Sequence, residues 1–174
     1  YAEDVYRQKR AVLWSDNQII DLSEGSGTSI ARSINDSGQI AMWSETGSGG
    51  VHGFLWDQGG MTDLGTFGGD NSWAYDLNNS GQVVGWSENE FGAYNAFVYD
   101  EGELFNIGTL GGGFSKAYAI NDLGQVVGSS VDVYGKTHAV LWNPVPEPSS
   151  IFMLGLGLVC AFNKRSSGRK CRES

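Results

Sequence analysis

A repeat of 43 residues constrains this chain more than any other feature of its sequence. The segment INDSGQIA at 34–41 recurs as LNNSGQVV at 77–84 and as INDLGQVV at 120–127. The glycines of these segments, Gly38, Gly81 and Gly124, are therefore 43 residues apart each time. A fixed period of this length is typical of proteins that are built from repeated supersecondary units.

Two further markers keep the same period. Apolar tetrapeptides (AVLW, GFLW, AFVY and AVLW) end at Trp14, Trp56, Tyr99 and Trp142, with spacings of 42, 43 and 43 residues. An acidic or amide residue followed by an aliphatic one recurs at 21–22, 63–64 and 106–107. Three independent markers with one period make the repeat assignment strong.

Each repeat has the pattern of four short strands. In the middle repeat we expect them at about Ala74–Leu77, Gln82–Ser87, Asn95–Tyr99 and Leu104–Ile107. The residues between the first two strands, 78–81, are NNSG, and Asn and Gly adopt positive φ at low cost, which predicts a hairpin turn. Four strands in about 43 residues is the size of a β-propeller blade. We therefore predict an all-β, partial β-propeller-like array of four-stranded repeats; a β-solenoid is the alternative architecture.

The repeat markers divide the chain into five parts. These are a partial repeat at 1–20, repeats at 21–62 and 63–105, a repeat lacking its last strand at 106–143, and a C-terminal region at 144–174. The thirteen strands expected in this division complete three blades at most, and a propeller has about four or more. We therefore expect further repeats upstream of Tyr1. We also expect that any signal peptide was removed or lies upstream.

Charge is distributed unevenly along the chain. The net charge is −9. Residues 1–162 hold six Lys/Arg against nineteen Asp/Glu, whereas residues 163–174 hold five basic residues against Glu173. The acidic body argues against nucleic acid as a partner. Both cysteines, Cys160 and Cys171, lie in the last fifteen residues, which excludes a disulfide framework or a thiolate zinc site in the residues before them.

Residues 1–143 resemble the HAF repeat, a repeat of exported bacterial proteins named for a His-Ala-Phe triplet. The resemblance is carried by DLGTFGG at 63–69, GTLGG at 108–112, INDLGQVVG at 120–128 and THAVLW at 137–142. The triplet itself varies: it is HGF at 52–54, NAF at 95–97 and HAV at 138–140, and residues 23–27 depart from the GTLGG pattern. The variation indicates that the histidine is dispensable.

The C-terminal region resembles the PEP-CTERM sorting signal, in which a Pro-Glu-Pro motif, an apolar run and a basic cluster follow one another. The resemblance assigns the sorting motif to Val145, Pro146, Glu147 and Pro148, and the basic stop to Lys164 and Arg165. It implies a Gram-negative bacterium, an exosortase as partner, and export with transient anchoring in the inner membrane before display at the cell surface or release into the extracellular matrix.

The apolar run of this signal is short. It comprises Ile151, Phe152, Met153, Leu154, Gly155, Leu156, Gly157, Leu158, Val159, Cys160, Ala161 and Phe162. As a helix these residues would span about 18 Å of a hydrocarbon core of about 30 Å, so we expect a short C-terminal hydrophobic helix that serves as a transient membrane segment. The basic residues after it favour the cytoplasmic side. The alternative, a buried amphipathic helix, would need polar residues at helical spacing, and the run has none.

No sequence pattern predicts a catalytic residue, a metal site or a cofactor. His52 and His138 occupy equivalent repeat positions, which diverge around a ring, so a structural role is favoured over metal binding. The segments 76–81 and 121–124 suggest calcium, but they lack the ligand spacing of a calcium loop, and turn formation explains them. The motifs GTFGG and GTLGG lack the lysine of a phosphate loop, and GxSxG is absent.

The aromatic residues leave two interpretations of function open. Those that end the repeated tetrapeptides are expected to pack between blades, whereas Trp43, Trp73 and Trp86 lie elsewhere in the repeat and could present ring faces to sugars. We predict a non-enzymatic structural or adhesion protein of the surface, biofilm or exopolysaccharide matrix. A lectin-like propeller module is the alternative, and a propeller hydrolase is the weakest hypothesis because a fold alone carries no activity.

Overall fold

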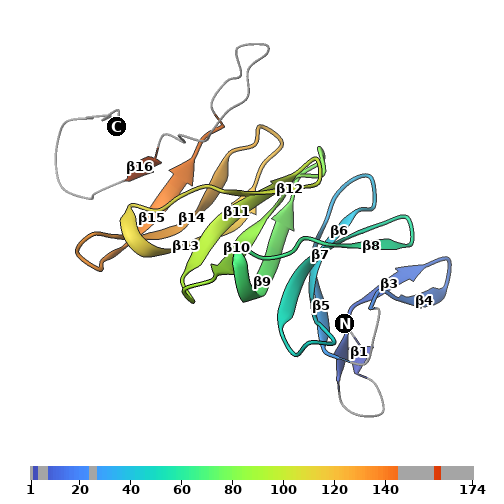
Figure 1. The fold of residues 1–174 in the computed structure, drawn as a ribbon. Coiled ribbons are helices and arrows are strands. Elements are labelled where there is room, and N and C mark those ends of the chain that lie inside the picture. Colours follow the sequence, from blue (N-terminus) through green and yellow to red (C-terminus); the bar gives the residue numbers. More distant parts are fainter. Residues whose placement is uncertain (1, 4–7, 24–26, 145–158, 162–174) are drawn as a thin grey trace.

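The computed structural model describes residues 2–3, 8–23, 27–144 and 159–161, and these residues form strands joined by turns (Figure 1). The described residues contain no helix, so the all-β prediction is confirmed for them. None of their elements could therefore cross a bilayer as an apolar helix.

The strands follow the repeat. Near the N-terminus, β1 (Ala2–Glu3) pairs with β2 (Lys9–Arg10), and β3 (Val12–Ser15) forms a hairpin with β4 (Gln18–Asp21). Three antiparallel meanders come next, and Figure 1 shows them one after another across the molecule. Meander B comprises β5 (Ser29–Ile34), β6 (Ile40–Glu45), β7 (Val51–Asp57) and β8 (Gly60–Asp63). Meander C comprises β9 (Gly68–Leu77), β10 (Val83–Asn89), β11 (Tyr94–Asp100) and β12 (Glu103–Asn106). Meander D comprises β13 (Gly111–Ile120), β14 (Val126–Asp132), β15 (Thr137–Trp142) and β16 (Val159–Ala161).

The strands predicted for the middle repeat are confirmed, although β9 begins at Gly68 instead of Ala74. The hairpin turns are confirmed as well, because Gly38, Gly81 and Gly124 have φ values of +80°, +81° and +72°. An L-residue rarely adopts such a φ. The periodic glycine thus has the conformational role that the sequence suggested.

The helix predicted over 151–162 is wrong for the three of its residues that the structure describes. Val159, Cys160 and Ala161 form β16, which pairs with Trp142, Leu141 and Val140 of β15. The equivalent residues of β11 pair with β12, so β16 occupies the place of a fourth strand. An unpaired strand edge accepts any extended apolar segment that can reach it, which is the physical reason for a strand here. The rest of the predicted helix lies outside the described residues.

The hydrophobic core lies between successive repeats. Each cluster of buried side chains combines residues of two neighbouring repeats, for example Val84 and Ala96 of meander C with Ala117 and Val140 of meander D. The expectation that the tetrapeptide aromatics pack between repeats is met by Trp56, Tyr99 and Trp142. It is wrong for Trp14, which lies outside these clusters and is 70% exposed.

Close approach of strands requires glycine at one periodic position. A Cβ atom at Gly85 would lie 1.8 Å from the carbonyl oxygen of Trp73, and one at Gly128 would lie 2.0 Å from that of Lys116. Both glycines lie at a register irregularity of their meander, between β9 and β10 or between β13 and β14. The irregularity brings the two backbones closer together than any side chain allows.

Candidate functional site

Six aromatic side chains come together where meanders C and D meet. The cross-strand pair Trp73 and Trp86 stacks with ring centroids 4.2 Å apart at an interplanar angle of 22°. The contacts continue from Trp86 to Tyr94 (5.0 Å) and from Tyr94 to Phe114 of β13 (4.6 Å). Tyr75 and Tyr118 lie 6.0 Å apart. We call this set, Trp73, Tyr75, Trp86, Tyr94, Phe114 and Tyr118, the aromatic surface.

Two cations lie on the aromatic surface. The Lys116 Nζ atom is 4.5 Å from the ring centroid of Trp86 and 4.7 Å from that of Tyr94. The Arg32 Cζ atom is 5.1 Å from the centroid of Tyr75. The negative faces of the rings attract both cations. Within the part of the chain that the structure describes, Lys116 forms no salt bridge, so its charge is balanced only by ring faces.

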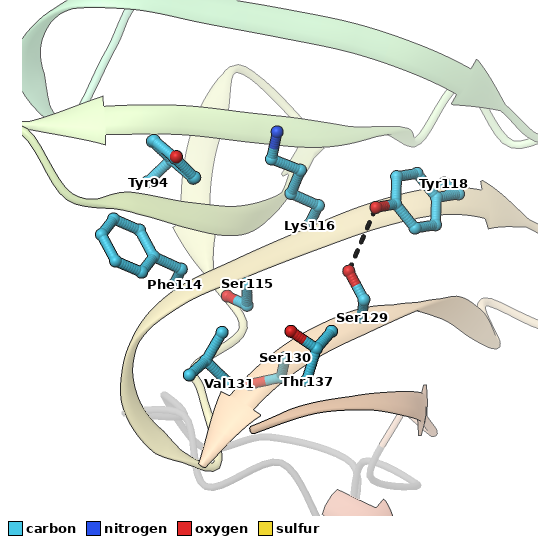
Figure 2. A pocket seen from close by; sticks show the side chains of 9 residues that line it. All are labelled: Tyr94, Phe114, Ser115, Lys116, Tyr118, Ser129, Ser130, Val131 and Thr137. Carbon is cyan, nitrogen blue, oxygen red and sulfur yellow. Dashed lines mark hydrogen bonds between the residues drawn. The ribbon is translucent and has the colours of Figure 1, made fainter. Parts of the chain in front are cut away.

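A hollow of about 290 Å³ opens beside Lys116. Figure 2 shows Tyr94 and Phe114 on one side of the lysine and Tyr118 on the other, with Thr137 and Ser129 on the neighbouring strands. The hydroxyl groups of Tyr118 and Ser129 are hydrogen-bonded at 3.1 Å. Aromatic faces, hydroxyl groups and one ammonium group therefore line a single open hollow.

Trp73 and Trp86, two of the three tryptophans considered for sugar binding, do not provide the open ring faces of this surface. Trp86 is only 8% exposed, and Trp73 covers one face of its indole. Phe114 and Tyr118, by contrast, are 40% and 50% exposed. The open ring faces thus belong to residues of β13 that the sequence did not single out. Their signal was the FSKAY segment at 114–118, where the preceding repeat has NSWAY.

Buried serines connect the repeats, and the sequence analysis missed them. The Oγ atoms of Ser29, Ser72 and Ser115 accept hydrogen bonds from the backbone N–H groups of Ala11, Gly53 and Ala96 in the preceding repeat, at 2.9, 3.0 and 2.9 Å. Ser87 and Ser130 accept hydrogen bonds from the N–H groups of Phe67 and Leu110, which directly precede the first strand of the same meander. The signal was available, because serine recurs at 29, 72 and 115 with the repeat period.

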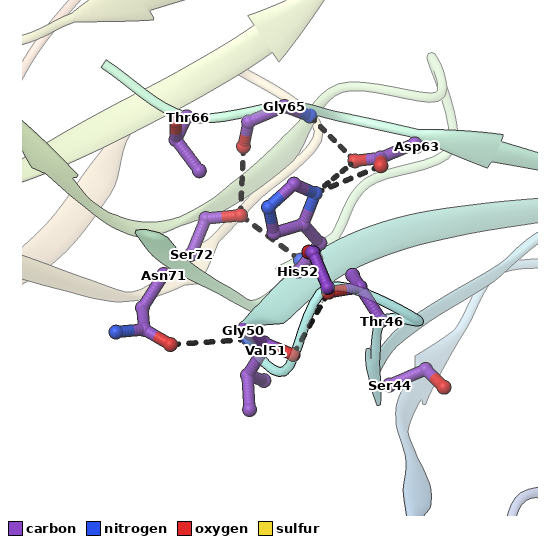
Figure 3. A network of polar contacts seen from close by, with 12 residues as sticks. Ser44, Thr46, Gly50, Val51, His52, Asp63, Gly65, Thr66, Asn71 and Ser72 are labelled. Atoms are coloured by element: carbon purple, nitrogen blue, oxygen red, sulfur yellow. Dashed lines mark hydrogen bonds and ion pairs between the residues drawn. The ribbon is translucent and has the colours of Figure 1, made fainter. Parts of the chain in front are cut away.

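His52 belongs to a polar network that closes the loop after β8 (Figure 3). Its Nδ1 atom lies 2.9 and 2.8 Å from the carboxylate oxygens of Asp63, and Asp63 also accepts from the Gly65 N–H at 2.8 Å. Ser72 donates to the Gly65 carbonyl oxygen at 2.7 Å. The histidine therefore holds a turn of its own repeat in place.

His138 contacts a carboxylate at a different position of its repeat, on the strand before it. Its Nε2 atom lies 2.8 Å from Asp132 Oδ2. Hydrogen bonds from the Lys136 and Tyr134 N–H groups and from His138 lower the pKa of Asp132. The described residues contain no cluster of three His, Cys, Asp or Glu side chains that could hold a metal ion.

The segments considered for calcium are used within the fold. Each turn asparagine accepts two backbone N–H bonds of its own turn. Asn35 and Asn78 also donate to the backbone of the next repeat, and Asn78 reaches the Asn121 carbonyl oxygen at 3.1 Å. Asp76 accepts from the Ser33 hydroxyl at 2.6 Å and from the Ile120 N–H at 3.0 Å. The turns thus form a ladder of hydrogen bonds from repeat to repeat.

Of the predicted sorting residues, Val159, Cys160 and Ala161 lie in β16. The other predicted residues lie outside the described residues: the sorting motif at 145–148, the segment 151–158, Phe162 and the basic stop at 164–165. Their assignment depends on sequence comparison alone.

A family model described as the PEP-CTERM protein-sorting motif matches residues 144–167. This match supports an exported protein that is sorted by exosortase, with a transient membrane-associated C-terminal signal. No curated protein matches the chain in sequence.

The fold is similar to the crystal structure of TolB from Acinetobacter baumannii, with a TM-score of 0.57 and 12% sequence identity. The match covers 84% of this chain and 35% of the TolB chain, so the present chain spans about a third of TolB. At this level of identity the likeness concerns the fold alone.

Proposed function

We propose that this chain is a non-enzymatic structural or adhesion module that exosortase sorts to the cell surface or into the extracellular matrix. The observation that carries the proposal is the PEP-CTERM match at 144–167, directly after a body made of repeats. The repeats support a structural role because cores, serine contacts and turn hydrogen bonds all connect one repeat to the next. Such a body is extended by adding repeats.

We further propose that the repeats are of the HAF type and that they belong to a propeller-like array. Meanders B, C and D each have four strands in antiparallel order, and β7 of meander B also pairs in parallel with β9 of meander C at Val51 and Asn71. Their first strands, β5, β9 and β13, contact one another in succession. Contact between first strands supports a radial arrangement around an axis.

The sorting proposal is tested in the native host. We expect mass spectrometry of the surface or matrix fraction to recover the body without residues 169–174, with a new C-terminus near residues 145–150. Replacing Pro146, Glu147 and Pro148 by alanine should leave the uncleaved chain in the inner membrane, because the accessible motif is lost. Pro144→Ala, which alters a proline outside the motif, is the matched control. An intact C-terminus on surface protein would contradict the proposal.

A second candidate function is carbohydrate binding. It is favoured by the open ring faces of Phe114 and Tyr118 beside a hollow that is also lined by hydroxyl groups. A flat aromatic face packs against the C–H face of a sugar ring, while hydroxyl groups exchange hydrogen bonds with its rim. The candidate is compatible with a matrix role, since an adhesion module needs a ligand.

A further inference from the structure

The hollow beside Lys116 is a local departure from the repeat. In meander C the cross-strand pair Trp73 and Trp86 fills this position with two stacked indoles. In meander D, 43 residues later, the corresponding cross-strand pair is Lys116 and Ser129. Tyr94 of β11 is likewise replaced by Thr137 of β15. Three bulky rings are thus exchanged for smaller or flexible side chains while the strand pairing stays the same.

The strands around the hollow keep their pairing although the side chains are smaller, because buried serines hold them by hydrogen bonds. Ser115 and Ser130, in the floor of the hollow, are buried and hydrogen-bonded to Ala96 and Leu110. Functional sites are expected where one repeat departs from a side-chain pattern that a neighbouring repeat keeps on the same backbone. The exchange also introduces a charge, which packing alone does not require.

Lys116 sets the chemistry of the ligand. It is one of only six basic residues in the first 162 and has no carboxylate partner in the described part of the chain. The faces of Trp86 and Tyr94 fix its ammonium group without using its hydrogen-bond donors. A carboxylate of a ligand would satisfy both the charge and the donors.

We infer that the hollow binds a carboxylate-bearing sugar, one uronic acid unit of a polysaccharide, with its ring against Tyr94, Phe114 or Tyr118 and its carboxylate at Lys116 Nζ. Thr137 and Ser129 also line the hollow, and in this inference their hydroxyl groups bond to those of the sugar ring. The inference rests on the proposed matrix role and names its ligand class. The acidic body repels long polyanions, so recognition concerns a single sugar unit and its affinity is modest.

The test uses the purified 174-residue chain and two probes, methyl β-D-glucuronide and methyl β-D-glucoside, which differ in whether C6 is a carboxylate. Titration followed by NMR should show saturable binding of the glucuronide, about tenfold tighter than the glucoside. Lys116→Gln should remove this preference and leave weak binding of both probes. Arg32→Gln, which alters the cation over Tyr75, is the matched control and should keep the preference.

A second variant fills the hollow. Lys116→Trp combined with Ser129→Trp restores the pair that meander C already accommodates, so it should fold and bind neither probe. Equal binding of both sugars by the wild-type chain, a preference that survives Lys116→Gln, or no saturable binding would overturn the inference. None of these results depends on sorting. Failure of the inference is therefore distinguishable from failure of the sorting proposal, which is read in the host.

Discussion

Meanders C and D share a backbone but differ at one face. Both have a buried serine that accepts from the preceding repeat, a turn asparagine with a positive-φ glycine three residues later, and a glycine where two backbones nearly touch. Meander C places two stacked indoles on this face, whereas meander D places a lysine and a serine there and has a hollow. The serine, asparagine and glycine contacts are thus kept in both meanders, whereas the side chains of this face differ.

The largest effect should come from a residue that both meanders need. Gly85→Ala should destabilise the chain by about 3 kcal/mol, because the added methyl group meets the Trp73 carbonyl oxygen. Gly128→Ala should cause a similar loss in meander D. Gly113→Ala is the control: no atom lies within 4 Å of a Cβ there, so its effect should stay within about 0.5 kcal/mol. Urea unfolding monitored by tryptophan fluorescence measures all three, and equal midpoints would refute the close approach.

The second-largest loss of stability should distinguish the β9–β10 turn of meander C from the β13–β14 turn of meander D. Asn78 is buried and its side chain bonds to the Asn121 carbonyl oxygen, whereas Asn121 is exposed and the described bonds of its own side chain stay within its turn. Asn78→Ala should therefore cost about 2 to 3 kcal/mol and Asn121→Ala about 1 kcal/mol. Thermal unfolding of the two variants gives the comparison. A larger loss from Asn121→Ala would contradict the ladder between repeats.

A smaller effect is expected at the turn glycine of meander C. Gly81 has a φ of +81°, and valine should destabilise the hairpin by about 1 kcal/mol or more since it resists that conformation. Ser80→Ala, one residue earlier and exposed, serves as the control. The difference in melting temperature between the two variants is the measurement, and identical values would argue against a strained turn.

The smallest effect concerns pH. Hydrogen bonds from the Lys136 N–H and from His138 lower the pKa of Asp132 below 3.8. The ionised carboxylate is therefore favoured in the folded state, so its contribution is present above pH 3.8 and is lost as the pH falls through the lower folded-state pKa.

Meander C offers the matched variant for this test. Asn89, the equivalent of Asp132, accepts from the Phe91 and Ala93 N–H groups in the same turn. Asp132→Asn should thus keep the turn while removing this part of the acid sensitivity. Unfolding free energies measured between pH 5 and pH 2 should fall less steeply in the variant than in the wild-type chain. An unchanged slope would show that Asp132 contributes nothing to acid unfolding.

The sequence predicted the repeat, the all-β class, the turn glycines and the sorting signal. It failed at Trp14, which we expected to be packed, and at Val159–Ala161, which pair with β15 as a strand. Both errors arise from the same cause. A short motif such as a tetrapeptide or an apolar run shows which conformations a segment can adopt. Whether the segment is buried, and which strand it pairs with, depends on the segments that lie next to it in the fold.

What the sequence determined by itself is therefore periodic and local. Turn conformation depends on a few adjacent residues, and strand alternation is visible within one repeat, so both can be read without knowing the partners. Only the tertiary structure decided the candidate site. Tyr94 and Phe114 are twenty residues apart in the chain, yet their rings come within 4.6 Å because β13 packs on β10 and β11. Lys116 and Ser129 line the hollow beside those rings. Which side chains of one repeat meet those of the next depends on how the strands pack, so this contact could not be predicted from the sequence of either repeat.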